Sequence, residues 1–335
     1  MSEDLADTEW GAFREAGPWE VPATGCEWQR DLDRTRARVV GSVPELTRRV
    51  LVPPVRRLAV TVAHLGYGLG RWAISRKDLP LRLRVAAEHL GPSYIKLGQI
   101  ISSGRGLFTD DLVEEFSALR DRVPPEPFST IVQVVEADLG RPLHHVFSSF
   151  EVQPLAAASI AQVHAATLVS GEQVVVKVQR QTVAARVRAD LQVMAWIAPF
   201  LVGRIPVTAL ANPPALVELF AETITEELDF RLEAENMIDV ARCFADLGQR
   251  RYVVPRPHPT LVTERVLVME RLEGFAFDDA VGMRAAGIDT EAVVRTGMIG
   301  FLEGAMFHGL FHGDLHGGNL PVSYTHLTLP TICSV

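Results

Sequence analysis

Cysteine is scarce in this chain, which has only Cys26, Cys243 and Cys333 among its 335 residues. Their separations match neither a zinc motif nor a small disulfide framework, which excludes a disulfide-stabilised secreted domain and fits a reducing compartment. The chain also lacks an uncharged apolar run of about 18 residues, the length that a membrane-spanning helix requires. Its acidic N-terminus has no apolar centre and does not resemble a signal peptide. We therefore expect a cytoplasmic protein whose membrane contact is at most peripheral, at the inner face of the membrane.

Overall positive charge is lacking too, because the formal net charge is −8. This balance argues against a general nucleic-acid-binding surface, so we expect no nucleic-acid partner. Acidic residues gather before residue 30, whereas arginine and lysine dominate residues 30–84, where apolar residues recur at helical spacing. A basic amphipathic helix can lie on an anionic membrane surface. An ordinary solvated helix face is the alternative, and the sequence leaves both open.

The pattern of apolar residues divides the chain into segments. Residues 48–121 read as helical, and a proline-rich boundary at Val123–Phe128 precedes a helix with a cap-like Ser129 or Thr130. Two strands then flank a turn at Ser170–Glu172, helices continue through Asn236, and strands follow at 252–254, 260–263 and 266–270, before a helix at 291–307. Helices around a small antiparallel sheet predict an α+β fold. The expected units are a loose segment 1–47, a helical extension 48–128, a sheet-containing lobe 129–273, the start of a helical lobe 274–320 and a tail 321–335.

The motif HGDLHGGN near residue 314 carries the strongest chemical signal. Asp314 and Asn319 lie five positions apart, the spacing of a kinase catalytic loop, in which the asparagine binds Mg²⁺. Upstream, Lys177 lies in a predicted strand, and the segment EELDFRLEAEN offers acids that we expect on one helix. Taken alone, that lysine fits an outward-facing strand position and those acids fit a solvated helix face. Their order along the chain, with a hinge-like strand near Glu270 and Leu272 between them and the loop, favours a kinase.

A glycine-rich phosphate loop is missing before Lys177. A protein kinase carries G-x-G-x-x-G at this place. Here Ala156, Ala157, Ala158 and Ser159 stand instead. Alanine restricts positive φ angles, so we expect a stiffer loop that holds the nucleotide differently.

These motifs together resemble the UbiB/AarF-type atypical kinase family. The resemblance spans about residues 79–320 and includes the segment YIKLGQ with a K-x-G-Q motif, the alanine-rich loop, the VVVKVQR strand, the E-x-D helix and the catalytic loop. It implies a bilobal protein-kinase-like fold with a helical N-terminal extension. It also implies that ATP and Mg²⁺ are the cofactors. The K-x-G-Q motif separates this family from aminoglycoside and choline kinases, whose catalytic loops are similar.

The resemblance also implies roles for individual residues. Lys177 would contact the α- and β-phosphates, Glu233 would pair with it, Asp314 would be the catalytic aspartate and Asn319 a Mg²⁺ ligand. Ala156–Ser159, Glu270 and Leu272 would line the nucleotide site. The K-x-G-Q residues Lys96, Gly98 and Gln99 would lie over that site, held by Glu227 and Asp229. An ion pair of Lys96 with Glu227 or with Asp229 is the corresponding hypothesis.

The implied function is an atypical kinase or ATPase that supports quinone or isoprenoid-lipid metabolism at a membrane surface. A small-molecule phosphotransferase and a non-catalytic nucleotide-binding regulator are the alternatives. The phosphoryl acceptor, the quinone type and the oligomeric state are not encoded in these motifs.

The sequence departs from the kinase pattern after Asn319. No Asp or Glu occurs from Leu320 to Val335, so the second metal-binding aspartate is missing. Residues 321–335 resemble a translated sequencing-library adapter, and we expect them to be non-native. We therefore expect an incomplete C-terminal lobe and impaired activity of the chain as written.

Overall fold

The structure is a computed structural model that describes residues 25–48, 53–75, 78–119, 123–202, 212–248, 252–272, 274–276, 279–309, 321–322 and 327–328. The predicted catalytic loop, with Asp314 and Asn319, lies outside these residues.

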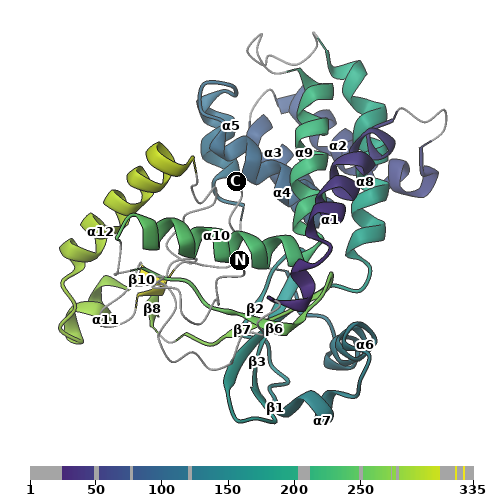
Figure 1. Cartoon of the computed structure of the whole chain (residues 1–335). Helices are drawn as coiled ribbons and strands as arrows, with labels where there is room; N and C mark the ends of the chain where they lie inside the picture. Colours follow the sequence, from purple (N-terminus) through teal and green to yellow (C-terminus); the bar gives the residue numbers. More distant parts are fainter. Residues whose placement is uncertain are drawn as a thin grey trace.

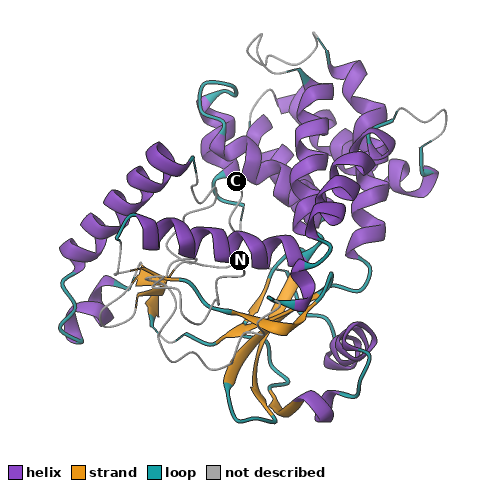
Figure 2. Ribbon diagram, viewed as in Figure 1, coloured by secondary structure: helices purple, strands orange, loops and turns teal. Residues whose placement is uncertain are grey.

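A six-stranded antiparallel sheet forms the lower part of the molecule in the view of Figure 2. Its path is β1-β3-β4-β7-β6, and β2 pairs with β3 at one side. The strands are β1 (Phe147–Phe150), β2 (Ala156–Ala157), β3 (Ala161–Leu168), β4 (Gln173–Gln179), β6 (Pro257–Val262) and β7 (Val266–Glu270). Strands β3 and β4 form the predicted hairpin, whose turn uses Gly171 at φ +104°. Positive φ costs glycine little because it has no Cβ atom.

The two faces of β4 point to different neighbours because side chains alternate along a strand. Val174, Val176 and Val178 are fully buried in a core shared with α6 (Phe128–Leu139) and α7 (Leu143–Val146). The residues between them face α10 (Phe230–Asp246), whose apolar side packs on the opposite face of the sheet. The sheet is therefore enclosed by helices on both faces, and Lys177 lies on the α10 side.

A helical region adjoins the sheet and has its own core (Figure 1). It contains α2 (Val55–Ser75), α3 (Leu79–Leu90), α4 (Pro92–Ser103), α5 (Asp110–Phe116), α8 (Val183–Leu201) and α9 (Pro213–Glu227). Its centre holds the buried Asp190 of α8, which accepts hydrogen bonds from Arg57 of α2 (3.1 Å from Nη2) and from Ser93 of α4 (2.6 Å). The region thus combines the predicted extension with α8 and α9, which follow the first strands.

Two further groups of elements complete the described chain. The segment η1 (Glu27–Gln29) and α1 (Leu32–Leu46) lies at the start of α10, with Trp28 and Leu32 in the same core as that helix. On the other side lie α11 (Ala280–Ala285), α12 (Thr290–Glu303) and the π-helical turn η2 (Gly304–His308). A small sheet of two-residue strands joins β5 (Tyr252–Val253), β10 (Leu327–Thr328), β9 (Pro321–Val322) and β8 (Phe275–Ala276). The origin of the tail 321–335 stays a prediction.

None of the helices in the described part of the chain is both long and apolar enough to cross a membrane.

Two local predictions are wrong. The acids of EELDFRLEAEN do not share one helix, because α9 ends at Glu227 and α10 begins at Phe230. Asp229 is extended (φ −124°, ψ 100°) and caps α10, where its carboxylate accepts from the Arg231 N–H. The helix predicted from Ser129 or Thr130 has Pro127 as its N-cap and begins at Phe128.

Candidate nucleotide site

The centre of the site is an ion pair between β4 and α10. The Lys177 Nζ atom lies 2.8 Å from Oε1 and 2.7 Å from Oε2 of Glu233. Both side chains are only 11% exposed, and the ammonium also lies 4.9 Å from the centre of the Phe230 ring. A buried ammonium needs such partners because its desolvation is costly. The predicted pairing of the strand lysine with the helix glutamate is present.

The alanine-rich segment lies in register with this lysine. Ala156 pairs with Val163, Val163 pairs with Lys177, and Lys177 pairs with Leu267, so one row crosses four strands. Side chains in such a row point to the same face of an antiparallel sheet. Neighbouring strands lie about 4.8 Å apart, which puts Ala156 roughly 10 Å from Lys177 along the row.

The turn of the alanine-rich segment is held by main-chain acceptors. The Ala158 carbonyl accepts from Arg180 Nε at 2.9 Å, and the Ala157 carbonyl accepts from the Val123 N–H at 3.2 Å. Ser159 is buried, with 1% of its surface exposed. The turn is thus tied to the chain before α6, and its predicted stiffness stays a prediction.

The side chain of Glu270, at the end of the hinge-like strand β7, faces away from Lys177. Glu270 pairs with Val174, so its side chain points to the α6 face, opposite to Lys177. Its Oε2 atom accepts a hydrogen bond from the Arg256 N–H at 3.4 Å. A nucleotide contact by Glu270 would therefore use the main chain. Leu272 follows the strand and is half-buried, and its role stays a prediction.

The K-x-G-Q motif lies on α4. Lys96 Nζ is 2.6 Å from Oε1 of Glu227, at the C-terminal end of α9, so this form of the ion-pair hypothesis is confirmed. Gly98 allows a close helix contact, because a Cβ atom there would lie 2.7 Å from Cδ1 of Phe116 and even closer to Leu119. Gln99 is half-buried, and its carbonyl accepts from Ser102. Whether this helix covers a nucleotide stays a prediction.

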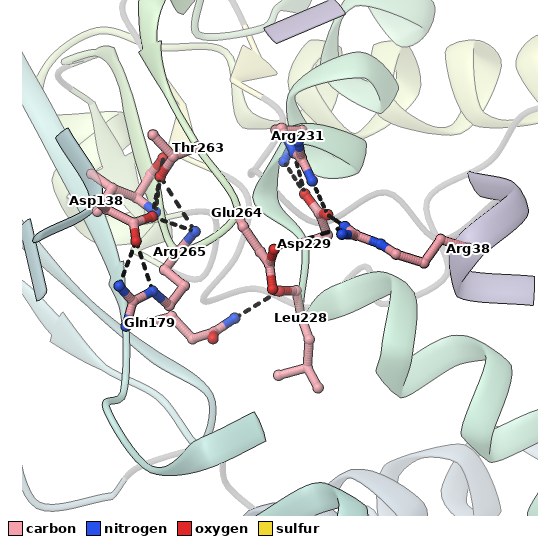
Figure 3. Close-up of polar contacts among 10 residues, drawn as sticks. Arg38, Asp138, Gln179, Leu228, Asp229, Arg231, Thr263, Glu264 and Arg265 are labelled. Carbon is pink, nitrogen blue, oxygen red and sulfur yellow. Dashed lines mark hydrogen bonds and ion pairs between the residues drawn. The ribbon is translucent and has the colours of Figure 1, made fainter. Parts of the chain in front are cut away.

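Asp229 has other partners than the hypothesis gave it. Its carboxylate, 4% exposed, accepts from the Arg231 guanidinium at 2.6 and 2.9 Å and from Arg38 at 3.2 Å (Figure 3). Beside it, the Leu228 carbonyl accepts from Gln179 Nε2 at 2.9 Å. The E-x-D motif therefore joins two structures, because Glu227 holds α4 and Asp229 holds α1.

Sequence reasoning missed Arg38 and Gln179. Arg38 lies 191 residues from Asp229 in the chain, and nothing in its local pattern separates it from the other arginines of residues 30–84. Gln179 lies two positions after Lys177 on the same strand face. Strand alternation could have predicted the position of Gln179. Residues two apart on a strand share a face, so a helix that packs against Lys177 also lies near Gln179.

The described residues contain no group of three or more His, Cys, Asp or Glu side chains that could hold a metal ion. The metal ligand implied by the resemblance, Asn319, lies outside those residues. A nucleotide does fit the described donor set, since Lys177 on the central strand β4 offers a cation oriented by a carboxylate, in the same cross-strand row as the alanine-rich segment.

These features define a kinase-like lobe: an antiparallel sheet, a lysine on one of its strands and a helix glutamate that forms an ion pair with this lysine. The family description "ABC1 atypical kinase-like domain" matches residues 118–333. The chain belongs to this family.

Individual relatives agree with the assignment. The uncharacterized protein Rv0647c of Mycobacterium tuberculosis is 45% identical over 234 residues, which is 70% of this chain and 48% of the relative. The probable protein kinase UbiB of Shewanella piezotolerans is 38% identical over 246 residues, 73% of this chain and 44% of the relative. The chain thus spans about half the length of the curated relatives it matches.

A solved structure is also similar. It is the complex of Rv3197 with erythromycin from Mycobacterium tuberculosis, which has a TM-score of 0.50 and 29% identity. The match covers 73% of this chain and 62% of that chain.

Proposed function

We propose that this protein is an atypical kinase or ATPase that binds Mg-ATP beside Lys177. The observation that carries the proposal is the Lys177–Glu233 pair, in which both carboxylate oxygens lie within 2.8 Å of the ammonium. Kinases use such a pair to direct the lysine to the α- and β-phosphates. Membership of the ABC1 family supports the same chemistry.

The roles follow from the position of each group. Glu233 would orient Lys177, whose remaining N–H would donate to a phosphate oxygen. Ala156–Ser159 would close the site over the phosphates with main-chain N–H groups. Asp314 would orient or deprotonate the acceptor hydroxyl, and Asn319 would bind Mg²⁺, the ion that neutralises charge on the phosphates in kinases.

Nucleotide titration tests the proposal. Lys177→Ala should weaken Mg-ATP binding by about 10- to 100-fold, the equivalent of roughly 1.5–3 kcal/mol for a hydrogen bond to a charged group. The matched control is Gln173→Ala, at the exposed far end of the same strand, and it should bind like the parent. Unchanged affinity in folded Lys177→Ala, or no binding by the parent chain, contradicts the proposal.

We propose quinone or isoprenoid-lipid metabolism as the biological setting, supported by the kinship to the probable protein kinases UbiB. A small-molecule phosphotransferase is the second candidate, favoured by the erythromycin complex of Rv3197. Mg-ATP turnover with a polyprenylated phenol against turnover with erythromycin separates the two. Nucleotide binding without turnover in a chain of the relatives' full length would favour the third reading, a non-catalytic regulator.

We also propose that the basic N-terminal region contacts an anionic lipid surface. The support is a groove of about 610 Å³ between α2 and α3, lined by Ala63, His64, Tyr67, Gly68, Arg71, Leu81, Arg82, Val85, Ala86 and His89. Tyr67, Leu81 and Val85 are exposed apolar side chains. The buried Nε of Arg82 has no hydrogen-bond partner among the described residues, so it can donate to an anion. Vesicle sedimentation with and without anionic lipid tests the contact.

A further inference from the structure

An N-terminal strap, residues 25–46, lies at the start of the helix that carries Glu233. The strap consists of η1 and α1. Its α1 runs beside α9 (Figure 1), and its buried residues belong to the same core as those of α10. The buried strap residues Cys26, Trp28, Leu32 and Val39 belong to the core cluster that also contains Phe230, Ile238 and Val240 of α10. The strap therefore shares a core with the helix that carries Glu233.

Hydrogen bonds attach the start of the strap to β6 and to α10. Near its start, Trp28 Nε1 donates to the His258 carbonyl of β6 at 3.2 Å. One residue later, Gln29 Nε2 donates to Glu235 Oε2 of α10 at 3.0 Å. These contacts attach the strap to the sheet and to α10 at once.

Arg38 makes the contact that reaches the first turn of α10. Its Nη2 atom lies 3.2 Å from Oδ2 of Asp229 and 3.7 Å from Oε2 of Glu264, in the turn between β6 and β7 (Figure 3). Asp229 is nearly fully buried, and a buried carboxylate is unstable without cations around it. Arg38 thus brings one of two cations to this acid, and Arg231 brings the other.

The same two acids hold the start of α10 in place. Asp229 is the N-cap and accepts from the Arg231 N–H, and the Glu264 carbonyl accepts from the Phe230 N–H at 3.0 Å. Glu233 lies four residues after Asp229, one turn along the helix, so any shift of this turn moves its carboxylate. Residues four apart on a helix share a face and move together.

We propose that Arg38 is a positioning residue for the Lys177–Glu233 pair, and that the strap thereby controls nucleotide affinity. The inference rests on the proposed nucleotide-binding function. Arg38 acts through Asp229 and Glu264, which set the position of the first turn of α10. Release of the strap lets that turn move and weakens the ion pair between Glu233 and Lys177. Because coupling between sites is reciprocal, nucleotide binding in turn stabilises the docked strap.

The chain offers a direct readout of this coupling, because it contains only Lys77, Lys96 and Lys177. Lys96 and Lys177 are equally shielded, each with 11% of the side chain exposed, and each is held by a glutamate. The rate of amine acylation at each lysine, followed by mass spectrometry, reports release of Lys177 with Lys96 as internal reference. This measurement needs no nucleotide.

The variants are Arg38→Ala, Arg38→Lys and the control Arg34→Ala. Arg34 lies on the same helix, is 88% exposed and pairs with the nearby Asp31. We expect Arg38→Ala to raise Lys177 acylation severalfold with Lys96 unchanged, and to weaken Mg-ATP binding by about five- to tenfold, a typical coupling between sites. Arg38→Lys, which keeps the cation, should restore most of both, and Arg34→Ala should change neither.

The outcomes separate this inference from the proposed function. If Lys177 acylation and nucleotide affinity in folded Arg38→Ala equal those of the parent, the positioning role is overturned. Equal increases at Lys96 and Lys177 indicate general loosening and overturn it too. If the parent binds no nucleotide but Arg38→Ala selectively exposes Lys177, the proposed function fails while the positioning role stands.

Discussion

The His258 imidazole shows how a single half-buried base links stability to pH. Burial lowers the pKa of His258 to about 4, against a smaller opposing effect of Glu172. Its Nδ1 accepts from the Thr260 N–H at 3.2 Å, which requires the neutral ring, and its carbonyl accepts from Trp28 of the strap. Protonation would therefore remove a hydrogen bond beside the strap.

The sign of the pH effect follows from the lowered pKa. Between about pH 6.5 and pH 4 the unfolded chain binds a proton at His258 that the folded chain does not, so stability rises with pH. Acidification through this window should cost up to about 1.4 kcal/mol per pH unit. His164 acts in the same direction, because burial lowers its pKa too.

Urea unfolding between pH 4 and pH 7 checks this prediction. His258→Asn offers a neutral side-chain oxygen in place of Nδ1, so its stability should fall less steeply with acid than that of the parent. The difference between the two slopes isolates His258 from His164 and from the carboxyl groups. Parallel slopes would show that His258 does not titrate as its burial requires.

At the residue scale, part of the site was predictable. The Lys177–Glu233 pair follows from the family resemblance, which supplied both positions. The sequence left open whether Lys96 pairs with Glu227 or with Asp229. The break between α9 and α10 turns Asp229 to other partners, and Lys96 pairs with Glu227. Arg38 was not predictable, because its partner lies on an element that only the tertiary fold brings near.

At the scale of elements, α4 depends on a glycine that the K-x-G-Q motif contains. A Cβ atom at Gly98 would overlap the side chains of Leu119 and Phe116. Overpacking of this kind typically costs about 1–3 kcal/mol. The same helix carries Lys96, so a displaced α4 also disturbs the Lys96–Glu227 pair.

We therefore expect Gly98→Ala to lower the free energy of unfolding by about 1–3 kcal/mol. Gly66→Ala is the matched control, because Gly66 lies within α2 and a Cβ atom there meets nothing within 4 Å. That control should stabilise the chain by about 0.5–1 kcal/mol, the ordinary gain of alanine over glycine in a helix. Chemical denaturation measures both, and equal effects would contradict the close contact of α4 with α5.

The sequence predicted elements well where one local pattern dominates. The β3–β4 hairpin follows from a valine-rich run after a glycine turn, and β7 agrees at both ends with the predicted strand 266–270. The break between α9 and α10 was missed because the acids there match helical spacing. The cap formed by Asp229 depends on a distant arginine and on the β6–β7 turn, which no local pattern contains.

At the scale of the whole molecule, buried or half-buried aspartates join elements that lie far apart in the sequence. Asp190 joins α2, α4 and α8, while Asp229 joins the strap to α10. A third cluster joins α6 to the β6–β7 turn, where Asp138 accepts from Arg265 Nε at 2.7 Å (Figure 3). The β6–β7 turn thus contacts α6 through Arg265 and the strap through Glu264, so movement of the strap can reach the sheet as well as α10.

The α2–α3 groove faces outward from these clusters and carries the last prediction. Between Val55 and Ser75 the chain has no acidic residue, so Arg71 and Arg82 lie beside an apolar groove with little opposing charge on α2. Each basic residue near an anionic membrane contributes about 1 kcal/mol of binding, and salt screens it. Arg71→Ala combined with Arg82→Ala should therefore weaken sedimentation with phosphatidylglycerol-containing vesicles by about 30-fold, equivalent to about 2 kcal/mol.

The matched control removes two arginines elsewhere, Arg34 and Arg295, which are exposed and pair within their own helices. Because the net charge of the two double variants is the same, a difference between them assigns binding to the groove rather than to overall charge. Binding of the parent chain should fall as salt rises and should be weak on pure phosphatidylcholine. Equal losses in both double variants, or equal binding to neutral vesicles, would show that the α2–α3 face is an ordinary solvated surface.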